Sequence, residues 1–484
     1  MNNLKTQSRM ALKWSSLAEV SAKALMPISN ILLARLLTPN EFGVIATVTM
    51  IISFADLFSD SGFQKFLIQY EFSDESSLYK SANVAFTSNF LLSVLLWLLL
   101  CLFNDSIATF VGNEGLGHVI VISGISLPIT SFSSIQSAIL KRKFEYYKLY
   151  LSRILSMLVP IFVTVPLAWL GLSYWSLIIG NIIGNLSVSI VLYVESNWKP
   201  KFHFSKSEFD KMFLFSFWSL NESIAMWLSS YIGTFIVGNV LNQYYLGLYK
   251  TTVTSVNGIF AIITSATTAV LFSTLSRLQQ NRNEYNRTYL NFINMVSVLI
   301  IPLGVGVYMY RELITSILLG SKWMEAIPLV GIYGLISSYT LVWGQYISEY
   351  FRGVGQPQLN VMMTVLYLFF LIPILFLSAS QNFMALVYWS SFAKIIQILI
   401  FWTILWIKFQ FNPLKILKST WRAVISSIFM GLFIYICRFF LIGMFFEICI
   451  IGLSILVYFF VYLCLNGKSD LMNIAEIFKG EKNE

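Results

Sequence analysis

Long apolar runs separated by short polar breaks recur along the whole chain. A helix that crosses the hydrocarbon core of a membrane needs about 20 apolar residues, and the runs have that length. They predict fourteen membrane-spanning helices, at residues 14–37, 43–64, 82–103, 118–140, 148–170, 173–194, 212–239, 246–273, 289–310, 325–349, 359–379, 384–407, 421–441 and 445–466. Because the loops between them are short, the pattern predicts an all-α polytopic membrane protein.

Composition excludes a soluble protein. Hydrophobic residues make up 57% of the chain and charged residues 11%, whereas soluble domains are about 45–50% apolar and about 25% charged. The four cysteines lie in apolar runs without paired spacing, and the two histidines lie in different loops. We therefore expect no disulfide framework, no metal site, no catalytic histidine cluster and no cofactor.

The positive charges follow the predicted topology. If both termini are cytoplasmic, 24 of the 32 lysines and arginines fall in inner segments. Only three fall on the outer side: Arg311, Lys322 and Arg438, the last of these at the outer end of the span 421–441. Cytoplasmic loops of membrane proteins carry this excess of positive charge. The net charge of +9 is therefore a topology signal, and we expect no nucleic-acid partner.

Two stretches suggest that the chain is doubled. "NILLARLLTPNEFGVIATVTM" at 30–50 and "FIVGNVLNQYYLGLYKTTVTS" at 235–255 each join two apolar runs through a short polar turn. An offset of 204 residues aligns identical residues in three places: Leu37 with Leu241, Gly43 with Gly247 and Thr47 with Thr251. Farther along, an offset of 210 aligns Arg142 with Arg352 and Leu149 with Leu359. The alternative is that membrane hairpins simply resemble one another.

A doubled chain implies two lobes that point the same way in the membrane. Each would contain six spans, an even number, and a parallel repeat of this kind is typical of rocking-lobe transporters. We expect an N-terminal lobe at 1–200, a C-terminal lobe at 201–410, and two additional helices with a cytoplasmic tail at 411–484.

Several segments resemble a known family. "LLARLLTPNEFGVIATVTMIISFADLFSDSGFQKFLIQ", "AILKRKFEYYKLYLSRILS" and "LFSTLSRLQQNRNEYNRTY" are similar to segments of the polysaccharide transporters, the Wzx-type flippases for lipid-linked oligosaccharides. This family belongs to the MOP superfamily, together with the MATE drug exporters and the lipid II flippases. The resemblance covers most of the chain, but its motifs are loose patterns of Leu, Gly, Pro and basic residues.

The resemblance implies an activity and its partners. The expected cargo is an undecaprenyl-diphosphate-linked repeat unit of O-antigen, capsule or exopolysaccharide. It would pass by alternating access from the cytoplasmic to the periplasmic leaflet of a bacterial inner membrane. A polysaccharide polymerase and a chain-length regulator are the expected protein partners, and proton or sodium coupling is the expected energy source.

A diphosphate in a membrane needs cations, and ionisable residues within spans usually face a cavity or each other. The five basic residues assigned to neither side lie within the predicted spans and are the candidates for binding cargo: Lys23, Arg35, Arg153, Lys250 and Lys394. Each of the first three has an alternative role. Lys23 can pair with Glu19 one turn earlier, Arg35 can extend to the outer surface, and Arg153 can reach the basic inner loop. Lys250 and Lys394 are favoured because small or polar residues flank them at helical spacing.

Three acidic residues are candidates for ion coupling: Asp56, Asp60 and Glu222. Buried carboxylates can accept protons or coordinate sodium. Asp56 and Asp60 belong to a predicted polar face of the second span that also contains Ser53 and Gln64. The alternative is that these acids pair with the basic residues and only hold the lobes together.

Other classes of protein fit less well. A MATE-like ion-coupled exporter of small molecules shares the expected fold but favours an acidic cavity, whereas the charges within these spans lean basic. An enzyme would need catalytic residues in a large outer loop, and these loops are short. A scaffold role would leave the charges within the spans unexplained. No nucleotide-binding G-x-x-x-x-G-K-[ST] motif is present, which argues against direct use of ATP.

Overall fold

The computed structural model describes residues 2–60, 62–440 and 444–465, apart from some side chains in its first, second, eleventh and last helices. The chain divides into two compact units, Met1–Thr251 and Thr252–Glu484.

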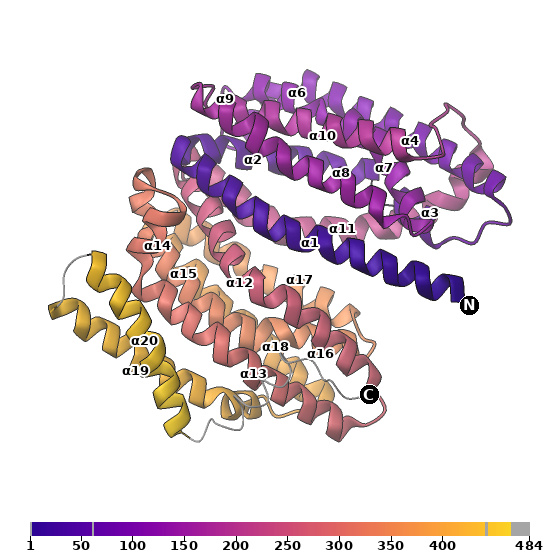
Figure 1. Cartoon of the computed structure of the whole chain (residues 1–484). Coiled ribbons are helices and arrows are strands. Elements are labelled where there is room, and N and C mark those ends of the chain that lie inside the picture. The colour runs from indigo at the N-terminus through magenta and orange to yellow at the C-terminus, as the bar shows by residue number, and fades with distance from the viewer. Residues whose placement is uncertain (1, 61, 441–443, 466–484) are drawn as a thin grey trace. The chain divides into compact units, whose positions relative to one another are not determined.

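The first unit is a bundle of helices, drawn from indigo to magenta in Figure 1. Its elements are α1 (Asn2–Leu36), α2 (Pro39–Asp60), α3 (Phe63–Gln69), α4 (Glu75–Leu102), α5 (Asn104–Phe110), α6 (Gly117–Gly124), α7 (Ser126–Arg142), α8 (Tyr146–Val159), η1 (Pro160–Thr164), α9 (Val165–Trp169), α10 (Trp175–Glu195) and α11 (Lys206–Val240). Helix α8 packs between α1 and α10, α7 packs against α4 and α10, and α2 packs against α4, α7 and α11.

The second unit begins within α12 (Gln243–Arg277), whose first nine residues belong to the first unit. Its other elements are α13 (Arg282–Met309), α14 (Arg311–Leu318), η2 (Ser321–Ala326), α15 (Ile327–Thr340), η3 (Leu341–Gln345), α16 (Tyr346–Gly353), α17 (Gln358–Ala379), α18 (Phe383–Phe409), α19 (Leu414–Phe440) and α20 (Met444–Cys464). Helix α13 packs against α15 and α19, α18 packs against α15 and α17, and α20 packs against α19.

Thirteen helical segments of the described chain are long and apolar enough to cross a membrane. Each overlaps one of the predicted spans, from Pro39–Phe58 to Phe446–Cys464. The remaining predicted span, 14–37, falls on α1, which is helical throughout but much less apolar than α2. The prediction of an all-α polytopic membrane protein is confirmed.

Some predicted spans are not single regular helices. The span at 118–140 is two helices, α6 and α7, which meet at Ile125, three residues before Pro128. The span at 148–170 is interrupted by the π-helical turn η1, which begins at Pro160. Proline lacks the N–H of a regular helical turn and crowds the preceding turn, which accounts for the irregular turns near Pro128 and at Pro160.

The compact units do not coincide with the lobes expected from the repeat. Helix α11 follows residue 200 in the sequence, yet it packs against α2 and α4 within the first unit. The helices α19 and α20, expected as an addition at 411–484, pack on α13 and on each other within the second unit. Packing and repeat symmetry divide the chain differently, so the repeat-based boundaries stay a prediction.

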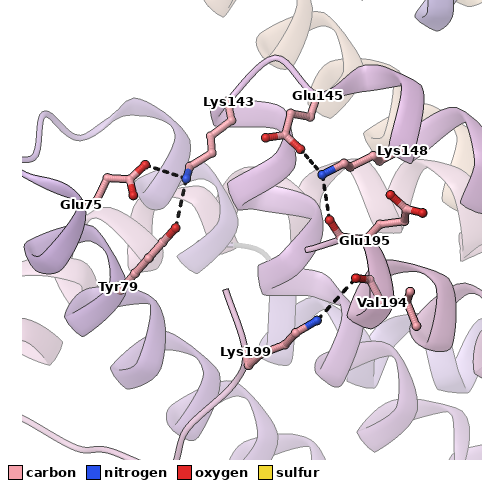
Figure 2. Close-up of polar contacts among 8 residues, drawn as sticks. All are labelled: Glu75, Tyr79, Lys143, Glu145, Lys148, Val194, Glu195 and Lys199. Carbon is pink, nitrogen blue, oxygen red and sulfur yellow. Dashed lines mark hydrogen bonds and ion pairs between the residues drawn. The ribbon is translucent and has the colours of Figure 1, made fainter. Parts of the chain in front are cut away.

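Lysines of the predicted inner loops tie helix ends together in the first unit (Figure 2). Lys148 binds the Glu145 carboxylate at 2.6 Å and the Glu195 backbone carbonyl at 2.8 Å. Lys199 donates to carbonyls in the last turn of α10, including that of Val194 at 3.5 Å. Cations stabilise helix C-termini because the last carbonyls lack helical partners. These lysines therefore have a structural role in addition to the role in topology predicted from the sequence.

Lys143 makes the other contacts drawn in Figure 2. Its ammonium group donates to the Glu75 carboxylate at 2.7 Å and to the Tyr79 hydroxyl at 3.0 Å, which joins the loop after α7 to the start of α4 (Figure 2). Partial burial alone lowers the pKa of Lys143, but the hydrogen bonds to Glu75 and Tyr79 outweigh it and raise that pKa above 10.5. Lys143 therefore stays charged at neutral pH.

Candidate functional site

Hydroxyl and amide side chains make up half of the residues that line two adjoining cavities in the first unit. One, of about 260 Å³, lies among α2, α6, α7 and α10. The other, of about 340 Å³, lies among α1, α8, η1 and α10. They share Leu177, Asn181 and Asn185 on α10. The two asparagines are one turn apart and joined by a hydrogen bond of 2.8 Å from Asn185 to Asn181.

A third cavity, of about 420 Å³, continues from the first between α2 and α11. It shares Ser53 and Asp56 with the first cavity and adds Ser223, Trp227 and Ser230. We call the three cavities together the polar tract. Its hydroxyl and amide groups are the following: Ser29, Asn30, Thr49, Ser53, Ser123, Ser126, Thr130, Ser156, Thr164, Asn181, Asn185, Ser223 and Ser230.

Among the residues that the structure describes, Asp56 is the charged residue that lines the polar tract. It is half-buried on α2, and its Oδ1 accepts a hydrogen bond of 3.3 Å from the Thr130 hydroxyl on α7. Asp56 lines both the first and the third cavity, so it lies where they join. Carboxylate, hydroxyl and amide oxygens are the ligands that hard cations prefer, and a carboxylate can also take up a proton. The surroundings of Asp56 therefore suit either ion.

Lys250 lies beside the third cavity. Its ammonium group is 3.5 Å from the backbone carbonyl of Ser230 and 4.7 Å from the centre of the Tyr231 ring. The Tyr231 ring stacks on Trp227 with 5.4 Å between centroids. Trp227 in turn donates a hydrogen bond of 2.9 Å to the Ser53 hydroxyl. A continuous series of contacts thus joins Lys250 to the wall of the polar tract.

Lys394 belongs to the second unit, on α18. Its ammonium group donates to the Ser337 hydroxyl at 2.6 Å and lies 3.5 Å from the centre of the Tyr333 ring. The Tyr333 hydroxyl donates to Asn257 on α12 at 3.3 Å. Lys394 is therefore held by polar and aromatic groups of α15, in a cluster to which α12 also contributes.

Five other residues were predicted for the site, and the structure describes the side chains of two of them. Arg35 and Arg153 are exposed, on α1 and α8, and neither lines the polar tract. The side chains of Lys23, Asp60 and Glu222 lie outside the described part of the structure. The expectation of one polar face from Ser53 to Gln64 is wrong at its end, because α2 ends at Asp60 and Gln64 lies in α3.

Most uncharged residues of the polar tract were not predicted from the sequence, Ser53 being the exception. The predicted candidates are ionisable, whereas Asn181 and Asn185 carry no charge. The signal was nevertheless present in "GNIIGN" at 180–185, because two asparagines four residues apart in an apolar helix lie on one face. Unpaired amides are costly in a membrane, so such a pair indicates a wet or polar surface.

The fold and this site define a class of membrane transporter, and the family model for polysaccharide biosynthesis proteins matches residues 32–328, more than half of the sequence. The chain belongs to this family.

Relatives with assigned names are transport and biosynthesis proteins of surface glycans. The succinoglycan biosynthesis transport protein ExoT of Rhizobium meliloti is 25% identical over 359 residues, which cover 73% of this chain and 70% of ExoT. The lipopolysaccharide biosynthesis protein WzxC of Escherichia coli is 22% identical over 383 residues, covering 76% of this chain and 75% of WzxC.

Solved structures show the fold. The lipid II flippase MurJ in an inward closed conformation superposes with a TM-score of 0.75 at 15% identity, covering 96% of this chain and 98% of MurJ. An inward-facing multidrug resistance MATE transporter of the MOP superfamily superposes with a TM-score of 0.60 at 13% identity, covering 85% of this chain and 99% of the transporter. The predicted MATE/MOP-like fold and the resemblance to polysaccharide transporters are confirmed.

Proposed function

We propose that the protein is a flippase for a polyprenyl-diphosphate-linked oligosaccharide, with undecaprenol as the expected lipid. The observation that carries the proposal is the polar tract, a set of cavities lined by hydroxyls and amides that extends from α1 to α11 and ends beside Lys250. The names of relatives such as ExoT and WzxC support a glycan as cargo.

The chemistry of the tract suits a sugar chain better than a cationic drug. Sugar hydroxyls both donate and accept hydrogen bonds, as do the Asn, Ser and Thr side chains of the tract. Each such bond replaces one that the sugar made with water, which lowers the cost of taking a glycan into the membrane. Lys250 supplies a positive charge for the diphosphate near one end of the tract.

Alternating access is the proposed route, and Asp56 is the proposed coupling residue. Asp56 lies where two cavities join and carries the negative charge of the tract. Binding of a proton or sodium ion there would remove that charge while an anionic cargo is present nearby. We therefore infer that ion binding at Asp56 favours cargo binding through reduced repulsion.

The remaining proposals concern the cell. The basic inner loops support a position in the bacterial inner membrane with both termini in the cytoplasm. Cargo would move from the cytoplasmic to the periplasmic leaflet. A polysaccharide polymerase and a chain-length regulator are proposed as the proteins that use the product, and no cofactor is required.

The test is a flipping assay with purified protein in liposomes. A fluorescent polyprenyl-diphosphate oligosaccharide is placed in both leaflets, and an impermeant quencher is added outside. We expect the wild-type protein to expose the inner-leaflet lipid to quenching and Asn181→Leu/Asn185→Leu to slow this strongly. Asn283→Leu, at an exposed position in the first turn of α13, is the matched control.

A small-molecule exporter with the same fold is the alternative, and the same liposomes distinguish it. If the protein moves cationic dyes along an ion gradient but leaves the glycan lipid in its original leaflet, the flippase proposal is wrong. Normal flipping by Asn181→Leu/Asn185→Leu would show that the glycan does not pass through the polar tract.

A further inference from the structure

An apolar groove of about 620 Å³ lies between α2, α4, α5 and α11 of the first unit. Its wall includes six aromatic residues: Phe54, Phe58, Phe103, Phe110, Trp227 and Phe235. Some of these rings pack in pairs, with centroids 4.8 Å apart for Phe54 and Trp227 and 5.5 Å apart for Phe110 and Phe235. The described residues that line the groove carry no charge, so a hydrocarbon chain is the occupant that suits it.

Trp227 forms a wall common to this groove and the polar tract. Phe54 packs on the Trp227 ring within the groove, while the Trp227 ring nitrogen donates to the Ser53 hydroxyl in the tract. Tyr231 stacks on the same ring and lies beneath the Lys250 ammonium group. The Trp227–Tyr231 pair therefore lies between the apolar groove on one side and Lys250 and the polar tract on the other.

We propose that the groove binds the polyisoprenoid tail of the cargo lipid while Lys250 holds its diphosphate. This inference rests on the proposed function and adds to it a site for the tail, with Trp227 at the junction between tail and head group. The tail then remains in an apolar surrounding while the sugars occupy the polar tract.

The position of the polar end favours this cargo over an ordinary phospholipid. Ser53 and Lys250 both lie within apolar spans, Pro39–Phe58 and Gln243–Arg277. A charged head group at such positions is costly unless protein groups replace its water, and Lys250 and the tract provide such groups. The branched, unsaturated isoprenoid chain also presents flat faces to the aromatic wall, where close contacts add dispersion attraction.

The test blocks the groove with a large side chain. Leu99 on α4 lines the groove and is 40% exposed, whereas its neighbour Leu98 is 48% exposed and does not line it. We therefore compare Leu99→Trp with the matched control Leu98→Trp, and use Leu228→Trp on α11 as a second blocking variant. The probes for binding to full-length protein in nanodiscs are a long-chain polyprenyl diphosphate with a photoreactive tail and the short geranyl diphosphate.

We expect both blocking variants to bind the long-chain probe about tenfold more weakly or worse, because excluded methylene groups lose their burial. Binding of geranyl diphosphate should not change, and Leu98→Trp should behave as wild type. Crosslinks of the long-chain probe should map to α4 and α11.

Three outcomes would overturn the inference. If blocking variants and control bind the long-chain probe equally while wild type flips glycan lipid, the groove assignment is wrong and the proposed function stands. If phosphatidylglycerol displaces the probe as well as unlabelled polyprenyl diphosphate does, the groove is an ordinary lipid site. If wild type flips no glycan lipid, the proposed function fails and the assignment to cargo fails with it.

Discussion

Gly43 on α2 and Gly247 on α12 lie against the backbone of each other's helix, in a reciprocal contact within the first unit. A Cβ atom on Gly43 would overlap the carbonyl oxygen of Gln243, and one on Gly247 would overlap that of Pro39. The two contacts are related by one offset, since 247 − 43 and 243 − 39 both equal 204. A twofold axis that relates two halves of a chain produces reciprocity of this kind, so this contact supports the predicted repeat.

The first prediction tests this helix crossing. Gly43→Ala and Gly247→Ala should each destabilise the protein by about 1–3 kcal/mol, because backbone atoms must move to admit the methyl group. Gly258→Ala is the matched control on α12, since an added Cβ there meets no atom within 4 Å. It should be neutral or stabilising by up to about 1 kcal/mol. Thermal unfolding in detergent measures all three, and equal behaviour of Gly43→Ala and Gly258→Ala would contradict the prediction.

Most of the fold could be predicted because apolar length is a strong signal. A run such as 359–379 has few alternatives to a membrane helix, and α17 at Gln358–Ala379 matches it closely. The irregular turns were harder to place, because a proline indicates an interruption but not its type. Pro160 begins a π-helical turn, whereas Pro302 lies inside the α-helix α13. Neighbouring helices decide between these outcomes.

The site could be predicted only in part. The polar face of the second span identified Asp56, which the structure places in two cavities. The sequence could not show that Arg35 and Arg153 are exposed and do not line the tract, because a basic residue near a helix end has the same pattern in either case. It also could not reveal Trp227 as a wall between polar and apolar cavities, since this depends on how α2 and α11 pack.

The second prediction concerns ion coupling. Asp56→Asn keeps the size of the side chain and removes its charge, so flipping should become independent of the proton or sodium gradient that we propose drives the wild-type protein. Thr130→Val, which removes the hydroxyl bound to Asp56, should shift the ion dependence without abolishing it. Liposome flipping under imposed proton and sodium gradients measures both. Unchanged gradient dependence in Asp56→Asn would exclude this carboxylate as the coupling site.

The third prediction concerns pH and stability. Glu208, in the first turn of α11, accepts hydrogen bonds from Lys211 at 2.8 Å and from Ser81 on α4 at 2.7 Å. The bond from Lys211, then that from Ser81, hold the pKa of Glu208 below its ordinary value of 4.5. A carboxylate with a lowered pKa in the folded state stabilises the fold above its ordinary pKa and loses this effect as the pH falls through the folded-state pKa.

Glu208→Gln should therefore be less stable than wild type at neutral pH by about 0.5–1 kcal/mol, a small value because the pair is partly exposed to solvent. The difference should shrink below pH 4.5 as Glu208 becomes protonated. Thermal unfolding across this range measures it. Glu312→Gln, at an exposed position on α14, is the control and should show a smaller difference at neutral pH. A difference that grows on acidification would contradict the assignment.

The last prediction separates charge from packing at the two lysines. Lys250→Met and Lys394→Met keep an unbranched stem and remove the ammonium group. One charge-assisted hydrogen bond is worth about 1.5–3 kcal/mol, so each change should slow flipping about ten- to a hundredfold if the lysine contacts the diphosphate. Lys→Arg at each position should retain part of the activity, because it keeps the charge.

The contacts of Lys394 provide an internal check on this prediction. Lys394 donates to Ser337 and lies over Tyr333. If these contacts only stabilise the fold, Lys394→Met should lower the thermal midpoint and leave the flipping rate of the folded fraction unchanged. A cargo-binding lysine would show the reverse. Lys415→Met, at an exposed position at the start of α19, controls for loss of positive charge alone. If both Met variants flip the glycan lipid at the rate of Lys415→Met, neither lysine binds the diphosphate.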